Sequence, residues 1–118
     1  MKYLFLLYAD EIAGAALSKE AMDGFMDEMY AYNEAMSQAG VRFTTEALHP
    51  TSTATTVHVQ NGKKIMTHGP FVETKEQLGG FFLIEAANLD EALEWAARCP
   101  AARWGTIEVR PVVDLPKK

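Results

Sequence analysis

The fold of this chain is decided by Thr67-His68-Gly69-Pro70-Phe71-Val72-Glu73-Thr74-Lys75-Glu76-Gln77-Leu78-Gly79-Gly80. This stretch joins two segments that we predict to be strands, and a plain hairpin would need only about 2–5 linking residues. Long ordered loops on a rigid scaffold commonly carry binding or catalytic residues. We therefore expect a functional site at residues 68–76.

A hairpin is predicted immediately before this loop. Asn61-Gly62 separates two alternating segments, residues 53–60 and 63–68. Asn-Gly favours a type I′ turn, which needs positive φ at both positions. Counting outward from this turn places Thr55 opposite His68, and cross-strand partners share a face. His68 then lies on the same face as three apolar side chains, Val57, Val59 and Met66.

Four further strands and two helices are predicted from periodicity. Strands are expected at residues 2–8, 41–48, 80–86 and 106–113. The first helix begins after Ser18 and ends at Gly40, with an apolar stripe formed by Met22, Phe25, Met26, Met29, Tyr32 and Met36. The second begins at Asn88 and ends before Pro100, with a stripe of Leu89, Ala92, Leu93 and Ala96. Residues 10–17 are predicted as a loop and residues 101–105 as a turn.

The order strand, helix, block of strands, helix, strand predicts an α+β fold, the ferredoxin-like split βαβ arrangement with an antiparallel sheet. The strands at residues 2–8 and 80–86 are apolar on both faces, which indicates burial on both faces. Two helices cover one face only. We expect a second copy of the sheet to cover the other, giving a homodimer of the dimeric α+β barrel type.

Composition narrows the function classes. The 118 residues carry a net charge of −5 and show no basic run beyond Lys117-Lys118, so direct nucleic-acid binding is not expected. No apolar segment approaches the about 20 residues that span a bilayer. Cys99 is the single cysteine and cannot form an internal disulfide. We expect one domain over residues 1–115, a C-terminal tail at 116–118, and a cytoplasmic location.

The loop also carries a resemblance. The stretch from His68-Gly69-Pro70-Phe71 to Ile84 resembles the signature of the DGPF-domain proteins of the YCII-related family, and residues 54–57, 89–100 and 105–111 extend the match. The resemblance implies a dimeric α+β barrel. It implies no established reaction, although related YCII proteins are suspected enzymes with a His and an Asp in a cleft. Two positions depart from the family pattern, because His68 replaces the usual Asp and His58 the usual Arg.

The candidate site residues cluster around the loop. His68 is the candidate catalytic residue because imidazole exchanges protons near neutral pH, and the alternative is a strand-end hydrogen-bonding role. The candidate ligand-binding residues are Tyr8, Glu46, Thr55, Glu73, Thr74, Lys75 and Glu76; the alternative for the charged ones is a solvated or subunit-contacting loop. We expect no metal, since His58 and His68 fall on opposite hairpin faces, and no cofactor, since no dinucleotide fingerprint is present.

Two functions remain open from the sequence. The first is a small-molecule-binding protein or enzyme, with a cleft near residues 68–76 at the dimer interface. The second is a non-catalytic interaction or regulatory protein whose loop contacts the other subunit or a partner. The resemblance favours neither, although some family members are encoded beside sigma-factor genes.

Overall fold

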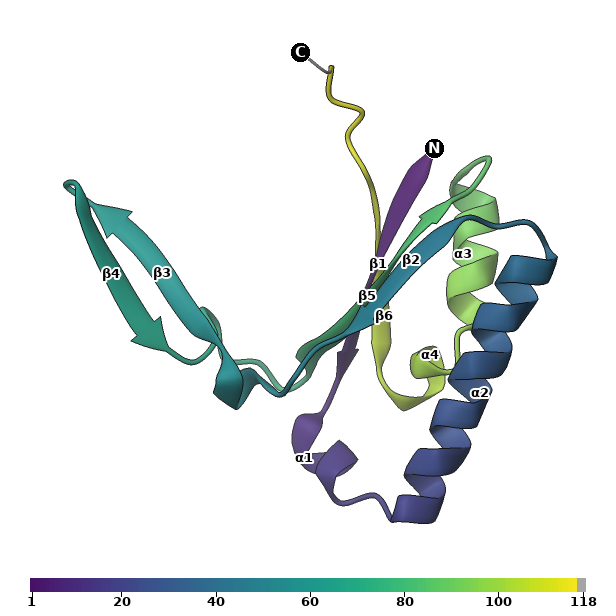
Figure 1. The fold of residues 1–118 in the computed structure, drawn as a ribbon, viewed down its shortest axis with the longest axis horizontal. Coiled ribbons are helices and arrows are strands. Elements are labelled where there is room, and N and C mark those ends of the chain that lie inside the picture. Colours follow the sequence, from purple (N-terminus) through teal and green to yellow (C-terminus); the bar gives the residue numbers. More distant parts are fainter. Residues whose placement is uncertain (117–118) are drawn as a thin grey trace.

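The computed structural model describes residues 1–116, and these form a four-stranded sheet with helices packed on one side (Figure 1). The strands are β1 (Lys2–Ala9), β2 (Phe43–Ala47), β3 (Thr55–Gln60), β4 (Lys63–His68), β5 (Gln77–Glu85) and β6 (Thr106–Pro111). The helices are α1 (Glu11–Ala15), α2 (Lys19–Gln38), α3 (Leu89–Arg98) and α4 (Ala101–Trp104), and a 3₁₀ turn spans Thr51–Thr53.

The sheet has the strand order β2-β5-β1-β6, and every neighbouring pair is antiparallel. With α2 and α3 as crossovers, this is the ferredoxin-like α+β arrangement that the sequence predicts. The β3–β4 hairpin does not pair with this sheet and is inserted between its second and third strands in chain order.

The core lies between the sheet and the helices. Tyr3 and Phe5 of β1 and Phe82 and Ile84 of β5 are buried there, because alternate side chains of a strand share a face. From the helices come Tyr32, Met36, Ala92, Trp95 and Ala96. The Tyr32 hydroxyl donates a hydrogen bond of 2.7 Å to the carbonyl oxygen of Trp95, which lies in the last turn of α3 and lacks an intrahelical partner. Burial raises the pKa of this hydroxyl.

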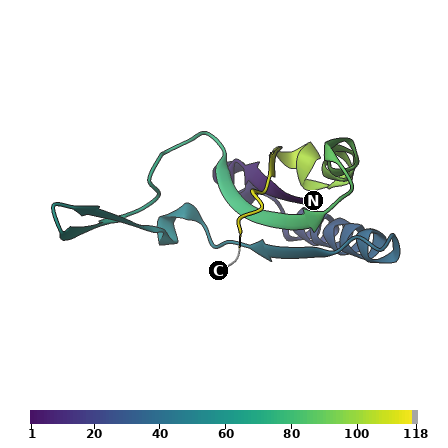
Figure 2. The ribbon, with the colours of Figure 1, turned by 90° about the horizontal axis from the view of Figure 1, so that it is seen from above.

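The opposite side of the sheet, here called the open face, is also apolar. Its central side chains are half-buried and come from paired positions of β1 and β5, namely Leu4, Leu6, Tyr8, Leu78, Phe81 and Leu83. Within residues 1–116 no helix lies over this face, since α2 and α3 pack on the other side (Figures 1 and 2). The expectation of a sheet with two apolar faces and one helical layer is confirmed.

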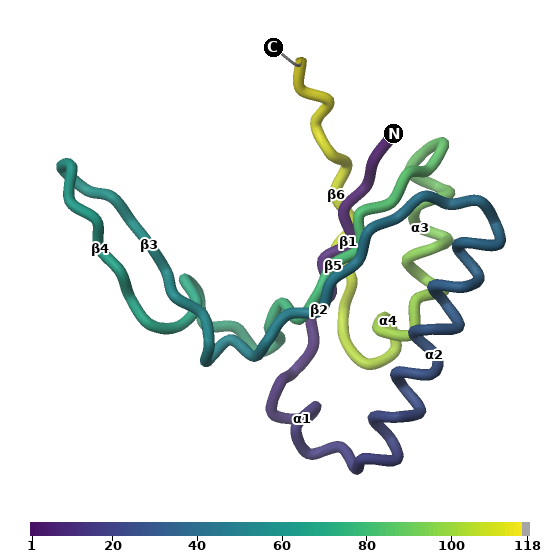
Figure 3. Tube along the Cα trace, viewed as in Figure 1, coloured from purple at the N-terminus to yellow at the C-terminus, as the bar shows by residue number. Residues whose placement is uncertain are grey.

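The β3–β4 hairpin, here called the arm (residues 55–68), projects away from the sheet on the side opposite the helices (Figures 2 and 3). Asn61 and Gly62 have φ of 52° and 75°, as a type I′ turn requires. The register pairs Gln60 with Lys63 and Thr55 with His68, so the predicted hairpin is confirmed residue by residue. Almost every side chain of the arm is exposed.

Local chemistry explains where the longer helices begin and end. Ser18 caps α2 by accepting from the Ala21 N–H, and Asn88 caps α3 by accepting from the Glu91 N–H. Gly40, with φ of 78°, follows the last turn of α2. These predicted helix boundaries are confirmed.

Three predictions need correction. Residues 10–17 are not a loop throughout, because Asp10 accepts from the Ile12 and Ala13 N–H groups and so caps α1. Residues 101–104 form the one-turn helix α4. The buried stripe of α3 is Ala92, Trp95 and Ala96, whereas Leu89 and Leu93 are exposed, because Trp95 packs against Tyr32 and turns the helix toward it.

We predict that Tyr32→Phe lowers the free energy of unfolding by about 1–2 kcal/mol, because the buried Trp95 carbonyl loses its partner. Urea denaturation measures the change. The matched control is Tyr30→Phe on the same helix, where the side chain is 64% exposed, and we expect a change within about 0.5 kcal/mol. Equal effects of the two substitutions would contradict this role for Tyr32.

Candidate functional site

The loop between β4 and β5 covers residues 69–76, and its start is fixed by hydrogen bonds to β3. Gly69 has φ of 98°, a conformation that favours glycine. Its N–H donates to the Ala54 carbonyl at 2.7 Å, and its own carbonyl accepts from the Thr56 hydroxyl at 2.8 Å. The chain therefore turns sharply at Gly69, away from the arm and back toward the sheet.

The end of the loop is shaped by a β-bulge. Leu7 pairs with Gly80 but Tyr8 pairs with Leu78, which leaves Gly79 as an extra residue. The sequence analysis predicts the strand to begin at Gly80, whereas β5 already begins at Gln77 and includes Gly79. A bulge bends its strand, so the last residues of the loop meet the end of β1 at the open face.

A cleft of about 650 Å³ lies between this loop and the end of the sheet. We call it the loop cleft. Its apolar wall contains Tyr8, Pro70, Phe71, Val72 and Leu78, and its polar wall contains Thr51, Ser52, Glu73, Thr74 and Gln77. Volumes of a few hundred cubic ångströms, with apolar walls and a few polar groups, are typical of small-molecule sites.

A chain of hydrogen bonds connects three residues of the polar wall through α1. The Glu11 carboxylate accepts from the Thr51 N–H and from the Thr51 hydroxyl, both at 2.8 Å. The Gln77 side chain accepts from the Glu11 N–H at 2.9 Å and donates to the Thr74 carbonyl at 2.5 Å. The network Thr51–Glu11–Gln77–Thr74 thus ties the loop and the 3₁₀ turn to the same helix.

The predicted site residues are only partly brought together. Tyr8, Glu73 and Thr74 line the loop cleft. Glu46 lies on the open face, paired with Phe81, but outside the cleft lining. Four other predicted residues do not line it either: Thr55, His68, Lys75 and Glu76. Thr55 and His68 face each other at the base of the arm, with exposed side chains.

Sequence reasoning missed Glu11, Thr51 and Gln77, which hold the cleft together. One signal was available, because Asp10 followed by Glu11 is a helix-start pattern and would have located α1. No comparable signal marks Thr51 or Gln77. Their roles arise from contacts between segments that are 40 and 66 residues apart in the chain.

Three further observations concern the described residues. In residues 1–116 no group of three or more His, Cys, Asp or Glu side chains is arranged to hold a metal ion. No helix in this part of the chain is both long enough and apolar enough to cross a membrane. Cys99 is fully buried, and burial raises the pKa of its thiol, which is typical of a structural cysteine.

Comparison with known proteins identifies relatives of the whole chain. Residues 1–116 match the family model described as the YCII-related domain. An uncharacterized protein of Rhizobium meliloti (strain 1021) is 41% identical over 114 residues, which cover 95% of this chain and 92% of that protein. Both matches include the arm, the loop and the segments that form the cleft.

We predict that Glu11→Ala loosens the loop cleft, because the Thr51 N–H and hydroxyl lose their acceptor. Hydrogen exchange of the Thr51 amide should accelerate strongly, and the free energy of unfolding should fall by about 1–2 kcal/mol. Glu20→Ala, in the first turn of α2, is the control and should leave Thr51 exchange unchanged. Unchanged Thr51 exchange in Glu11→Ala would show that the network does not hold the cleft.

Proposed function

This chain belongs to the YCII-related family, and from this premise we propose that it is one subunit of a homodimer that binds a small molecule in the loop cleft. The observation that carries the proposal is the position of the cleft. Tyr8 and Leu78 belong both to the open face and to the cleft lining. A second subunit packed on the open face would therefore border the bound molecule.

The shape of the subunit supports the dimer. Its radius of gyration is 16.5 Å, whereas a compact chain of this length has about 13.5 Å. Its shortest dimension, 18 Å, runs across the four strands of the sheet, whereas the arm and the helices extend from opposite sides of the sheet (Figure 1). A chain of this shape exposes far more surface than its length requires, and a second copy would bury it.

The arm supports the same assembly. Val57, Val59 and Met66 lie together on one of its faces, and each is more than half exposed. Scattered exposed apolar residues are ordinary, but an apolar face on an isolated two-stranded hairpin indicates an interaction surface. The arm lies on the same side as the open face (Figure 1), so one partner subunit can cover both. This two-sheet assembly is the dimeric α+β barrel.

The lining of the cleft favours a particular ligand chemistry. Tyr8, Phe71 and Leu78 offer apolar surface, while Thr51, Ser52 and Gln77 offer hydrogen-bonding groups. Glu73 is the one charged side chain in the lining, and all of these residues belong to the described part of the chain. Glu73 is exposed in the single chain, and its carboxylate would attract a cationic group of a ligand in the cleft and repel an anionic one. We therefore propose a ligand with an aromatic or apolar part and a neutral or cationic polar group.

His68 is the proposed proton-exchanging residue, and its position sets a condition on that role. The imidazole is exposed at the base of the arm and does not line the loop cleft of its own subunit. Acid–base chemistry at His68 would therefore require a surface supplied by the second subunit. We propose ligand binding as the primary function and proton exchange at His68 as dependent on the dimer.

A non-catalytic interaction function is the second candidate, and Phe71 favours it. This side chain is 87% exposed at the outer part of the loop. An exposed phenylalanine is a typical anchor of a protein interface. Under this alternative, the loop serves subunit or regulator contacts, as in an accessory protein associated with a sigma factor.

For either function we propose that the protein is cytoplasmic. We also propose that it belongs to the DGPF-type branch of the family, because it carries the motif His68-Gly69-Pro70-Phe71.

We predict that the protein sediments as a dimer at micromolar concentration and that Leu6→Lys converts it to a folded monomer. Leu6 lies in the middle of the open face, and its neighbour across the strands is Glu108, which would give the new lysine a partner in the isolated subunit. Leu93→Lys, at an exposed position of α3, makes the same change in side chain and charge and should remain dimeric. A stable monomeric wild type would refute the assembly.

We predict that tyramine raises the melting temperature more than 4-hydroxyphenylacetate does, because the two share a ring but only the amine complements Glu73. Glu73→Gln should abolish this preference, and Glu20→Gln, the control on α2, should keep it. An equal effect of the two compounds on the wild type would contradict the proposed ligand chemistry.

His68→Asn should retain binding but remove any dependence on pH that arises from this imidazole.

A further inference from the structure

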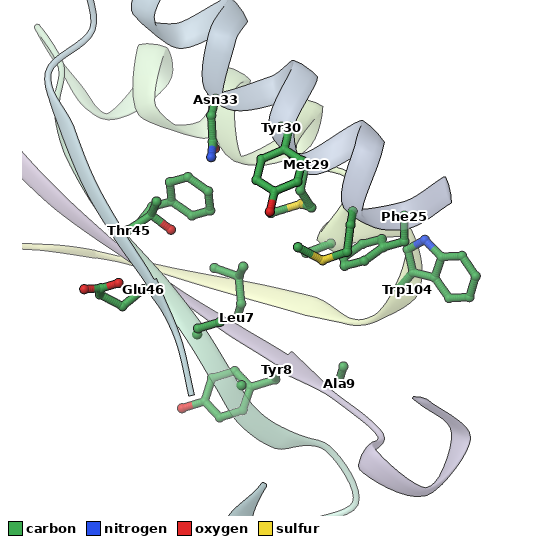
Figure 4. A pocket seen from close by; sticks show the side chains of 16 residues that line it. Leu7, Tyr8, Ala9, Phe25, Met29, Tyr30, Asn33, Thr45, Glu46 and Trp104 are labelled. Atoms are coloured by element: carbon green, nitrogen blue, oxygen red, sulfur yellow. The ribbon is translucent and has the colours of Figure 1, made fainter. Parts of the chain in front are cut away.

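A second hollow lies on the other side of the sheet, between α2 and the strands (Figure 4). It has a volume of about 480 Å³, and we call it the helix cavity. The side chains that shape it are mostly apolar, among them Leu7, Phe25, Met26, Met29, Phe82 and Trp104. The loop cleft opens on the opposite face of the sheet, and Tyr8 at the end of β1 lines both hollows.

The cavity exists because α2 packs closely on the sheet along only part of its length. Tyr32 and Met36, toward its C-terminal end, are buried against β5 and α3. Met29 and Phe25, one and two turns before Tyr32, are only partly covered, and Met26 is exposed. Figure 1 shows the helix diverging from the sheet toward its N-terminal end. The predicted apolar stripe of α2 is therefore present, but half of it faces a space.

The rim of the cavity is held by contacts from α4. Phe25 and Trp104 meet edge to face, with ring centroids 5.8 Å apart. Arg103, next to Trp104, pairs with Glu28 of α2. These contacts fix α2 to α4 at a distance from the sheet, so the space is part of the packed arrangement.

Asn33 supplies the polar feature of the cavity. It projects from α2 toward the sheet among apolar neighbours (Figure 4). Its Oδ1 atom is buried and, within residues 1–116, has no hydrogen-bond partner. Buried acceptors are almost always paired, because leaving one unpaired costs free energy without compensation. Oδ1 has no partner in the single chain, and a rotation of the side-chain amide would bring it into the cavity, where a ligand can donate to it.

The electrostatics of the cavity define the ligand further. Glu46 is the one charged residue in its lining among residues 1–116, and its carboxylate points away from α2, toward the open face (Figure 4). The Thr45 hydroxyl already donates to the Phe81 carbonyl at 2.9 Å. A charged ligand group would therefore be buried without a countercharge, which is strongly unfavourable.

We propose that the helix cavity binds a neutral, mainly apolar small molecule whose hydroxyl or N–H group donates a hydrogen bond to Asn33 Oδ1. Its volume suits a ligand of one to three rings. The methionines on α2 can adjust to different ring shapes, since their side chains are flexible and polarisable. This proposal does not rest on the loop cleft and stands if that cleft binds nothing.

The test compares 1-naphthol with 1-methoxynaphthalene, which share a ring system but differ in the donor. Equilibrium dialysis against the full chain should show 1-naphthol binding about fivefold more tightly, the effect of one neutral hydrogen bond. Asn33→Leu removes the amide at similar size and should equalise the two probes. Gln38→Leu removes an exposed amide from the same helix and should leave the preference unchanged.

A second variant tests the location. Met29→Trp fills the cavity from α2 and should abolish binding of both probes, while Phe71→Ala in the loop cleft should not affect it. Failure of the wild type to bind either probe up to its solubility limit would overturn the proposal. A retained naphthol preference in Asn33→Leu would overturn it as well. Weaker dimerisation of Met29→Trp would also overturn the proposal, because it would show that a segment of the second subunit, and not a small molecule, occupies the cavity.

Discussion

The pairing of β1 with β5 places two apolar faces on one sheet, and the rest of the structure follows from covering them. Tyr3, Phe5, Phe82 and Ile84 are covered by α2 and α3. Leu4, Leu6, Phe81 and Leu83 point the other way and are only half-buried in the single chain. Burying apolar area contributes about 25 cal/mol per Å², so leaving this face to water would forgo a large stabilisation. The thin subunit, its projecting arm and the site beside Tyr8 all relate to this second face.

Features set by neighbouring residues could be predicted from the sequence. The Asn61-Gly62 turn fixed the register of the arm, because only a few residues can adopt positive φ at both turn positions. Ser18, Asn88 and Gly40 marked helix ends through backbone hydrogen bonds that are local in the chain. The two-sided apolar pattern of β1 and β5 was likewise visible, and with it the ferredoxin-like order of elements.

Features set by distant contacts could not be predicted. The helix α1 begins with a recognisable Asp10-Glu11 start, but the contacts of Glu11 with Thr51 and Gln77 join distant segments and have no signal in the sequence. The stripe of α3 turned toward Trp95 because of Tyr32, a residue 63 positions earlier. The long loop lies between two strands as predicted, and of the predicted site residues Tyr8, Glu73 and Thr74 line the loop cleft; a ligand site there stays a prediction. The path of the loop depends on the turn at Gly69 and on the bulge at Gly79. The sequence alone does not show in which direction the chain leaves either of them.

The central claim is that a second subunit covers the open face, and hydroxyl-radical footprinting tests it directly. Oxidation of Leu6 and Phe81 should be slow at micromolar concentration and should rise on dilution, as the dimer dissociates. Phe5, which is buried in the single chain, should stay slow throughout, and exposed Leu93 on α3 should stay fast. Two results together would show that the face is uncovered and would contradict the account. The oxidation rates of Leu6 and Phe81 would not change with protein concentration, and Phe81 would be oxidised as fast in the wild type as in the Leu6→Lys variant.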